Sequence, residues 1–267
     1  MSMEIRLDEK VAVVTGGGSG IGRGIVHGLA ASGANVAIAD INESAAQVVV
    51  DEIESQHGVR GLAVRTDVTD KSSAENMVRE VMKALGGIDI LVNNAGIAPA
   101  YPLVDFPEDK WDLTVDINLK GYFLCGQAVV AQMLKQGRGG NIINISSKSG
   151  IRGSARNAGY TATKFGVIGL AQSWAREFAG QGIRANSVLP GNVLQGSGIW
   201  SEEYKASQAK KLGIKPEEVD EYYNRQVPLG RQCTPEDIAN IVVFLVSDKA
   251  SYVTGVSWLV DGGQEMR

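Results

Sequence analysis

The sequence has little of what marks several classes of protein. It has only two cysteines, Cys125 and Cys233, far apart and without metal-ligand neighbours, so neither a disulfide framework nor a zinc site is expected. Its 26 basic residues are outnumbered by 30 acidic ones and form no basic block, so a nucleic-acid partner is not expected. No apolar run approaches the roughly 20 residues that span a bilayer, so no membrane partner is expected either.

The amino-terminal stretch "MSMEIRLDEK" is charged from its fourth residue and lacks the apolar core of a signal peptide. The two cysteines suit a reducing compartment. Together these features predict a cytoplasmic protein. The chain has 267 residues, which is enough for one large domain with a single core.

Short, nearly all-apolar runs alternate with longer helix-like segments. The runs are VAVVT from residue 11, NVAIAD from 35, GLAVRTD from 61, IDILVNN from 88, NIINISS from 141, IRANSVLP from 183 and VSWLV from 256. They fit strands covered on both faces, and Asn42–Gln56, Lys71–Leu85 and Trp111–Gln136 fit crossover helices. This alternation predicts an α/β fold with one doubly wound, Rossmann-like parallel sheet and helices on both faces. No repeat or linker divides the chain, so residues 1–267 are expected to form a single domain.

The segment 192–228 interrupts this alternation because it is polar and charged. Ligands of doubly wound sheets bind outside the carboxyl ends of the strands, and this segment follows such an end. We therefore expect it to form a helical lid over the substrate. The alternative is a surface helical hairpin with no role in binding.

A glycine-rich turn, "TGGGSGIG", follows the first expected strand and opens a helix-like run. Glycines there let a pyrophosphate approach the amino end of the helix, where unpaired N–H groups favour negative charge. The turn residues expected to bind the cofactor are Gly16, Ser19, Gly20, Ile21 and Gly22.

Asp40 stands at the end of the second expected strand. A carboxylate in that place accepts hydrogen bonds from a ribose 2′-hydroxyl and repels a 2′-phosphate, so NAD is expected rather than NADP. The alternative is that Asp40 caps the helix beginning near Asn42. Two further strand ends, Asp67-Val68 and "NNAG" from 93, lie where a dinucleotide would extend.

Tyr160 and Lys164 are four residues apart in "GYTATKFG", so a helix places them on one face. Ser147 ends the fifth expected strand, and Asn118 lies in the helix-like segment before it. Taken in order, the glycine turn, "NNAG", Asn118, Ser147, "YTATK" and Pro190-Gly191 resemble the short-chain dehydrogenase/reductase family over the full length.

This resemblance implies hydride transfer between an alcohol carbon and a nicotinamide, with Asn118, Ser147, Tyr160 and Lys164 as catalytic positions. A free tyrosine has a pKa near 10, so only about one molecule in a thousand is phenolate at pH 7. We expect Lys164 and the oxidised nicotinamide to lower that pKa, so that Tyr160 serves as general base or acid. The family register selects Ser147 over Ser146 and Ser149 as the partner of the substrate oxygen.

The resemblance also implies further roles. Lys164 would hold the nicotinamide ribose, Asn118 would anchor a water that links Lys164 to solvent, and the protein would form homotetramers. The remaining cofactor contacts it implies are Asp67, Val68, Asn94, Ala95, Gly96, Tyr160, Lys164, Pro190, Gly191 and Val193. Where the family commonly has a threonine after Pro-Gly, this chain has Gln195. Either Gln195 or Asn192 would then make the cofactor contact that the threonine makes in the family.

Several stretches, including "GYFLC" from 121, "SKSG" from 147 and "KLGIKP" from 211, resemble the branch of the family that acts on sorbitol 6-phosphate. That resemblance implies the oxidation of D-sorbitol 6-phosphate by NAD to D-fructose 6-phosphate and NADH, or its reversal. "GSGIW" from 196 is similar instead to the dehydrogenase portion of bifunctional aldolase/dehydrogenases of deoxysugar breakdown. An unphosphorylated polyol such as sorbitol or galactitol, another secondary alcohol, and a non-catalytic NAD-binding scaffold or redox sensor are the alternatives.

A phosphorylated polyol needs cations near the catalytic tyrosine. Lys148 and Arg156 are the expected phosphate contacts, because each lies close in sequence to Ser147 or Tyr160. Further cations that we expect to be mainly solvated are Arg152, Lys205, Lys210, Lys211, Lys215 and Arg225. Asn157 and Asn192 are expected to contact substrate hydroxyls, and Ser147 and Tyr160 the reacting oxygen.

Overall fold

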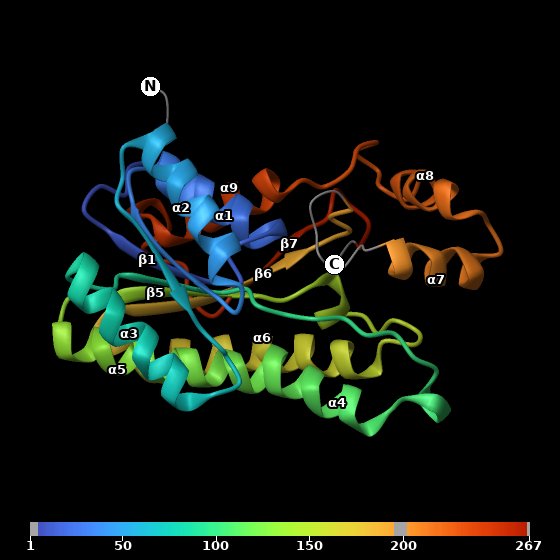
Figure 1. Cartoon of the computed structure of the whole chain (residues 1–267), viewed down its shortest axis with the longest axis horizontal. Helices are drawn as coiled ribbons and strands as arrows, with labels where there is room; N and C mark the ends of the chain where they lie inside the picture. The colour runs from blue at the N-terminus through green and yellow to red at the C-terminus, as the bar shows by residue number, and fades with distance from the viewer. Residues whose placement is uncertain (1–4, 195–201, 266–267) are drawn as a thin grey trace.

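The computed structural model describes residues 5–194 and 202–265 (Figure 1). Within these ranges a single parallel sheet has the strand order β3-β2-β1-β4-β5-β6-β7. The strands are β1 (Val11–Thr15), β2 (Asn35–Asp40), β3 (Gly61–Arg65), β4 (Ile90–Asn93), β5 (Gly140–Ile145), β6 (Ile183–Pro190) and β7 (Ser257–Val260). The predicted doubly wound sheet is confirmed. Its order reverses between β1 and β4, and the carboxyl ends there flank the place where such folds bind ligands.

Helices cover both faces of the sheet, as Figure 1 shows. One face carries α1 (Gly20–Ala31), α2 (Glu43–His57) and α9 (Pro235–Val246), and the other carries α3 (Lys71–Leu85), α5 (Gly121–Gln136) and α6 (Ala158–Phe178). Strand side chains alternate between the faces. Ala12 and Val14 therefore pack in the cluster under α1 and α9, while Val11 and Val13 pack under α3 and α5. Among the described helices, none combines the length and apolarity needed to cross a bilayer.

The helix predicted over Trp111–Gln136 is wrong as one element. The structure has α4 (Glu108–Val115), a π-helical turn η2 (Asp116–Lys120) and then α5. A π turn widens the helix by one residue and is common at functional sites. Here it holds Asn118, whose side chain binds the backbone of Ile97 on both its N–H and its carbonyl.

The segment expected as a lid contains α7 (Glu202–Leu212), the short turn η5 (Pro216–Glu218) and α8 (Val219–Asn224). Figure 1 shows α7 and α8 side by side beyond the carboxyl end of β6. The Tyr223 hydroxyl donates to Gln208 Oε1 at 3.0 Å, and Lys205 pairs with Asp220 at 2.9 Å, so the two helices are joined by polar contacts. The predicted helical character of this segment is confirmed for its described residues, and its action as a lid stays a prediction.

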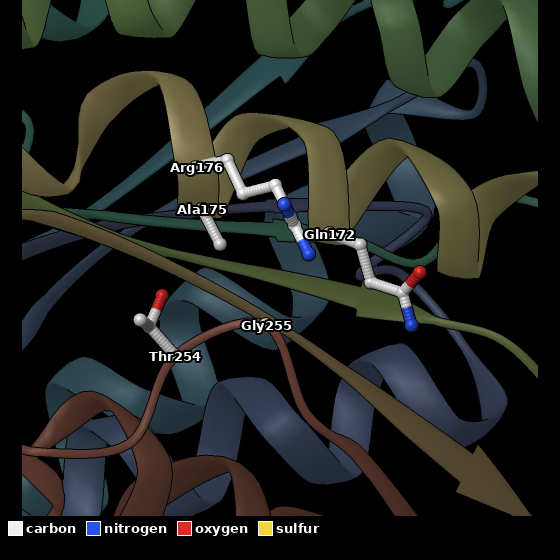
Figure 2. Close-up of a pocket in the computed structure, with 5 residues that line it drawn as sticks. All are labelled: Gln172, Ala175, Arg176, Thr254 and Gly255. Atoms are coloured by element: carbon white, nitrogen blue, oxygen red, sulfur yellow. The ribbon is translucent and has the colours of Figure 1, made fainter.

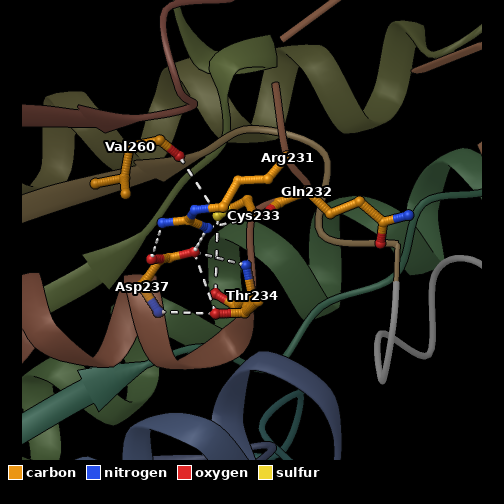
Figure 3. A network of polar contacts seen from close by, with 6 residues as sticks. All are labelled: Arg231, Gln232, Cys233, Thr234, Asp237 and Val260. Atoms are coloured by element: carbon orange, nitrogen blue, oxygen red, sulfur yellow. Dashed lines mark hydrogen bonds and ion pairs between the residues drawn. The ribbon is translucent and has the colours of Figure 1, made fainter. Parts of the chain in front are cut away.

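The start of α9 is fixed by a polar network, drawn in Figure 3. The Thr234 hydroxyl accepts from Asp237 N at 3.3 Å, while the Asp237 carboxylate accepts from Thr234 N at 2.9 Å, which makes a capping box. Arg231 donates to both oxygens of Asp237, at 2.6 and 2.8 Å. α9 supports the helix after the glycine turn, because a Cβ on Gly24 of α1 would lie 2.4 Å from Pro235 Cβ.

Asp237→Asn is expected to lower the free energy of unfolding by about 1 kcal/mol at pH 7, because it removes the charge that Arg231 and the capping box bind. The Arg231 hydrogen bond, helped by the Thr234 contacts and opposed by burial, lowers the pKa of Asp237 to about 2. The folded pKa lies below the usual value of 3.8, so the contribution is complete above that value and is lost as pH falls toward about 2. Urea unfolding at several pH values measures this.

The matched control is Glu236→Gln, an exposed residue of the same helical turn. It is expected to change the free energy of unfolding little at any pH. A loss for Asp237→Asn that stays constant between pH 7 and pH 2 would contradict the assignment of the effect to the Asp237 charge.

Candidate active site

Tyr160 and Lys164 lie one turn apart on α6, as predicted from their spacing. Lys164 is buried, and its Nζ donates to the Ile145 carbonyl at 2.7 Å and to the Tyr122 hydroxyl at 3.2 Å. The same Nζ is 5.6 Å from the centre of the Tyr160 ring. Burial lowers the pKa of Lys164 to about 7, so near neutral pH its charge is sensitive to what binds beside it.

Ser147 lies close enough to Tyr160 for its side chain to favour the phenolate, so the structure brings the predicted serine and tyrosine together. Burial raises the pKa of Tyr160 to about 12, and the Ser147 side chain offsets only part of that rise. The pKa of Tyr160 was expected to be lowered by Lys164 and the oxidised nicotinamide together. Lys164 alone does not do so here, because it is bonded to Tyr122 and Ile145 rather than to Tyr160 and because burial disfavours its protonated form; the part of the nicotinamide stays a prediction.

The three candidate serines have different surroundings. Ser146 donates its hydroxyl to the Lys164 carbonyl at 2.7 Å, so this hydroxyl is bound to the backbone of α6. Ser149 donates its backbone N–H to the Ser147 hydroxyl oxygen at 3.0 Å. Ser147 is therefore the serine that faces Tyr160, in agreement with the residue that the family register selected.

Asn118 is fully buried in the π turn. Its Oδ1 accepts from Ile97 N at 2.9 Å, and its Nδ2 donates to the Ile97 carbonyl at 2.8 Å and to Thr163 Oγ1 at 3.3 Å. The side chain thus ties the loop after β4 to α6, next to Lys164. The predicted water relay through Asn118 stays a prediction.

The glycine turn between β1 and α1 is very tight. Gly16 has a φ of +64°, and a Cβ on Gly22 would lie 2.1 Å from the Gly16 carbonyl oxygen. The Asn94 side-chain amide donates to the carbonyls of Thr15 and Gly16, both at 3.0 Å. Asn94 was predicted as a cofactor contact, which stays a prediction; its side chain holds the glycine turn in place.

The amino end of α1 fits a pyrophosphate. Ser19 is its N-cap but makes no side-chain capping bond, and its first turn has no acidic residue, so the N–H groups of Gly20, Ile21 and Gly22 meet no side-chain acceptor there. Such a helix end favours an anion. The residues present therefore fit the dinucleotide that the sequence predicted.

Asp40 accepts from Gly18 N and from Asn42 N, each at 2.9 Å. The helix cap of α2 is Asn42, whose side chain accepts from Ala45 N at 3.1 Å. The alternative in which Asp40 caps that helix is therefore wrong. Asp40 instead closes the glycine turn from the side where a cofactor ribose would lie.

The other predicted cofactor positions lie along the same edge of the sheet. Val68 is buried, and Asp67 accepts from Thr69 N and Thr69 Oγ1 at 2.9 and 2.7 Å. A Cβ on Gly96, which follows Ala95 in the loop after β4, would be 3.7 Å from Lys164 Nζ, so this loop passes directly beside the lysine. After Pro190, Gly191 N donates to the Val260 carbonyl at 2.9 Å, and Val193 is buried. Gln195 and "GSGIW" lie outside the described residues.

Besides Ser147 and Tyr160, the predicted substrate contacts are two cations and two asparagines. Lys148 is half-buried and donates to Gln264 Oε1 at 3.2 Å, whereas Arg156 is exposed and has a φ of +66°. Asn157 is buried, and its side chain lies close enough to Tyr204 on α7 to offset part of the rise that burial causes in the pKa of Tyr204. Within the described residues, Asn157 Oδ1 and Asn192 Nδ2 are buried polar atoms without a hydrogen-bond partner.

Other expected cations are already paired. Arg152 pairs with Glu265 at 2.8 Å, and Arg225 pairs with Glu221. Together with the Lys205 ion pair, this reduces the cations available for a phosphate.

Sequence reasoning missed three residues of the site. Tyr122 donates its hydroxyl to the Ile145 carbonyl at 2.9 Å beside Lys164, Tyr204 lies close enough to raise the pKa of Tyr160, and Gln264 binds Lys148. Tyr122 lies within "GYFLC", which had been noted only as a resemblance. Tyr204 and Gln264 reach the site from distant parts of the chain, and no local pattern signals them.

Two hollows lie away from this site. Figure 2 shows one between α6 and the loop before β7, lined by Gln172, Ala175, Arg176, Thr254 and Gly255. The other includes Arg138 and Arg184, near the amino ends of β5 and β6. Neither hollow contains Ser147, Tyr160 or Lys164. The candidate site is therefore defined by these residues, at the carboxyl ends of the strands, and not by either hollow.

Comparison with known proteins adds three findings. A family profile described as "Enoyl-(Acyl carrier protein) reductase" matches residues 16–265. Sorbitol-6-phosphate 2-dehydrogenase of Escherichia coli is 43% identical over 96% of this chain and 99% of its own length. L-rhamnose 1-dehydrogenase (NAD(P)(+)) of Sphingomonas sp. is 41% identical over 96% of each chain.

A solved structure is also similar. The crystal structure of sorbitol-6-phosphate 2-dehydrogenase SrlD from Erwinia amylovora superposes with a TM-score of 0.91. It is 44% identical in sequence, and the match covers 96% of this chain and 100% of that one.

Proposed function

The chain belongs to the short-chain dehydrogenase/reductase family, and from that premise we propose that it interconverts D-sorbitol 6-phosphate and D-fructose 6-phosphate with NAD. It is an oxidoreductase that acts on alcohol groups with a nicotinamide cofactor. The non-catalytic scaffold considered from the sequence is therefore set aside. The sugar phosphate, the choice of NAD and the residue roles are the parts of this function that we propose.

In the proposed reaction the chain moves a proton and positions an alcohol. Ser147 holds the substrate oxygen beside Tyr160, which its side chain already lies close enough to influence. Tyr160 accepts the hydroxyl proton as the carbon–hydrogen bond breaks, and returns a proton to the carbonyl oxygen in the reverse direction. A bound oxidised nicotinamide would supply the hydride acceptor and a positive charge that favours the phenolate. Lys164 stands on the same helix face with a pKa of about 7, ready to bind ribose hydroxyls.

The observation that carries the substrate proposal is the near full-length identity to two proteins named sorbitol-6-phosphate 2-dehydrogenase. The site agrees in chemistry. Asn157 and Asn192 offer buried amide groups to hydroxyls, and Lys148 and Arg156 offer charge to a phosphate. L-rhamnose 1-dehydrogenase is almost as similar, which makes an unphosphorylated sugar or polyol the alternative substrate.

The proposed NAD preference rests on Asp40, because a carboxylate in this place repels the 2′-phosphate of NADP.

The proposed single domain with a lid over about 192–228 rests on the continuous sheet and on Tyr204, which reaches from α7 to Asn157. A homotetramer and a cytoplasmic location stay predictions. Assembly has a surface available, since Phe123 on α5 and Phe165 on α6 are both exposed.

The experiment is to incubate the purified protein with NAD and D-sorbitol 6-phosphate, follow NADH, and identify the product by mass and by a ketose-specific assay. The proposal predicts one D-fructose 6-phosphate for each NADH formed. NADH formed with L-rhamnose or sorbitol, and none with the phosphate ester, would replace the proposed substrate with the alternative one.

A further inference from the structure

The sheet brings three strand ends together beside the catalytic serine. β5, β6 and β7 are neighbours in that order, so the turns after their carboxyl ends meet. These turns carry Lys148, Gly191 and the segment Asp261–Glu265, which we name the C-terminal segment. The Asp261 carboxylate accepts from Gly263 N at 3.0 Å and from Glu265 N at 2.7 Å. The segment is thereby folded into a fixed turn.

Two side-chain contacts join the C-terminal segment to the turn that bears Ser147. Lys148 Nζ donates to Gln264 Oε1 at 3.2 Å, and Arg152 binds both oxygens of Glu265 at 2.8 Å. On its other side, Gln264 Oε1 would be 2.9 Å from a Cβ on Gly191. The Gln264 amide therefore lies between the residue after the catalytic serine and the Pro-Gly turn.

The side-chain nitrogen of Gln264, unlike its oxygen, makes no hydrogen bond to the described residues. Gln264 Nε2 is buried and has no hydrogen-bond partner among the described residues, and the same holds for Asn192 Nδ2, one residue after Gly191. A buried N–H group without an acceptor is costly, so such groups commonly mark a place for a ligand or an ordered water. Two amide donors here fit a ligand rich in oxygen.

The charges of this corner are balanced. Lys148 faces Glu265, Asp261 and Arg152, which makes two cations and two anions. Burial lowers the pKa of Lys148, and the two carboxylates act in the opposite direction. Lys148 therefore keeps its charge within a group of two cations and two anions, and the Gln264 amide adds selection by hydrogen-bond geometry.

We propose that Gln264 is a specificity-determining residue: its Oε1 is held by Lys148, and its Nε2 donates to a substrate oxygen remote from the reacting carbon. This inference rests on the proposed site, with the reacting carbon at Ser147 and Tyr160. Glu265 and Arg152 act as positioning residues that hold Gln264 in place.

The test compares Gln264→Glu and Gln264→Ala with the wild type. Glutamate keeps the oxygen that accepts from Lys148 but replaces the amide donor with a second acceptor, so we expect KM for the sugar substrate to rise at least tenfold. Alanine is expected to raise the same KM. For both variants, kcat is expected to stay within threefold of wild type and KM for NAD to stay unchanged. Gln172→Glu, an exposed position on α6 away from the site, is the matched control for the added charge.

A purely structural role for Gln264 predicts a different result. Gln264→Glu would then keep the Lys148 contact, the melting temperature and the wild-type KM, and that outcome overturns the proposal. A fall in kcat together with a changed KM for NAD also overturns it, because it would mean that the whole site had shifted. If the wild type oxidises another sugar or polyol instead, the same KM comparison with that substrate tests Gln264 while the proposed function fails separately.

Discussion

Tyr160→Phe is expected to lower kcat for alcohol oxidation about 1,000-fold while NAD still binds, since general acid–base catalysis typically contributes on the order of 10²–10⁴ in rate. Phenylalanine keeps the ring beside Lys164 but removes the group that takes the substrate proton. It also removes the hydroxyl whose pKa Ser147 acts to lower. Steady-state kinetics gives kcat, and quenching of intrinsic fluorescence by NADH measures cofactor binding separately.

The matched control for this prediction is Tyr252→Phe, because Tyr252 is fully exposed in the loop before β7. It is expected to behave as wild type. If Tyr160→Phe kept kcat within a factor of three, Tyr160 would not be the proton acceptor, and the proposed mechanism would be wrong.

Asp40→Asn is expected to reduce the preference for NAD over NADP by about 10- to 100-fold. Two unit charges about 4 Å apart interact by roughly 1 kcal/mol in water and about 4 kcal/mol near a protein surface, and about 1.4 kcal/mol corresponds to a tenfold ratio. Asparagine removes the charge that repels a 2′-phosphate, yet it retains one oxygen for the Gly18 N–H. We expect kcat/KM to rise with NADP and to fall modestly with NAD.

Asp51→Asn serves as the control for Asp40, since Asp51 is an exposed carboxylate on α2 whose Oδ1 accepts from Gln47. Its cofactor preference should equal that of wild type. A wild-type enzyme that uses NADP as well as NAD would contradict the role given to Asp40 before any variant is made.

The sheet could be predicted from the sequence because its central strands, such as β1 and β4, are buried on both faces. That burial produces nearly continuous apolar runs, and the run from 183 became β6 with the same limits. Boundaries were less certain where polar residues follow a strand. β5 ends at Ile145, so Ser146 and Ser147 lie just beyond it. The π turn at 116–120 could not be predicted, because it depends on the contact of Asn118 with a distant loop.

The candidate site was predictable where its residues form local patterns. The spacing of Tyr160 and Lys164 and the glycine turn are patterns of this kind, and the structure brings Ser147 to Tyr160 as expected. Lys148 was predicted as a phosphate contact from its position alone, and this stays a prediction; what the sequence did not indicate is its contact with Gln264. That pairing joins residues far apart in the chain, so only the fold reveals it. The raised pKa of Tyr160 likewise reflects burial, which the local sequence does not encode.

The most direct test of the central claim is the ratio of kcat/KM for D-sorbitol 6-phosphate to that for unphosphorylated D-sorbitol, both measured with NAD. The account predicts a ratio well above ten, because the site is proposed to bind a phosphorylated polyol. A ratio near or below one would contradict it, and would identify the protein as a dehydrogenase of an unphosphorylated alcohol.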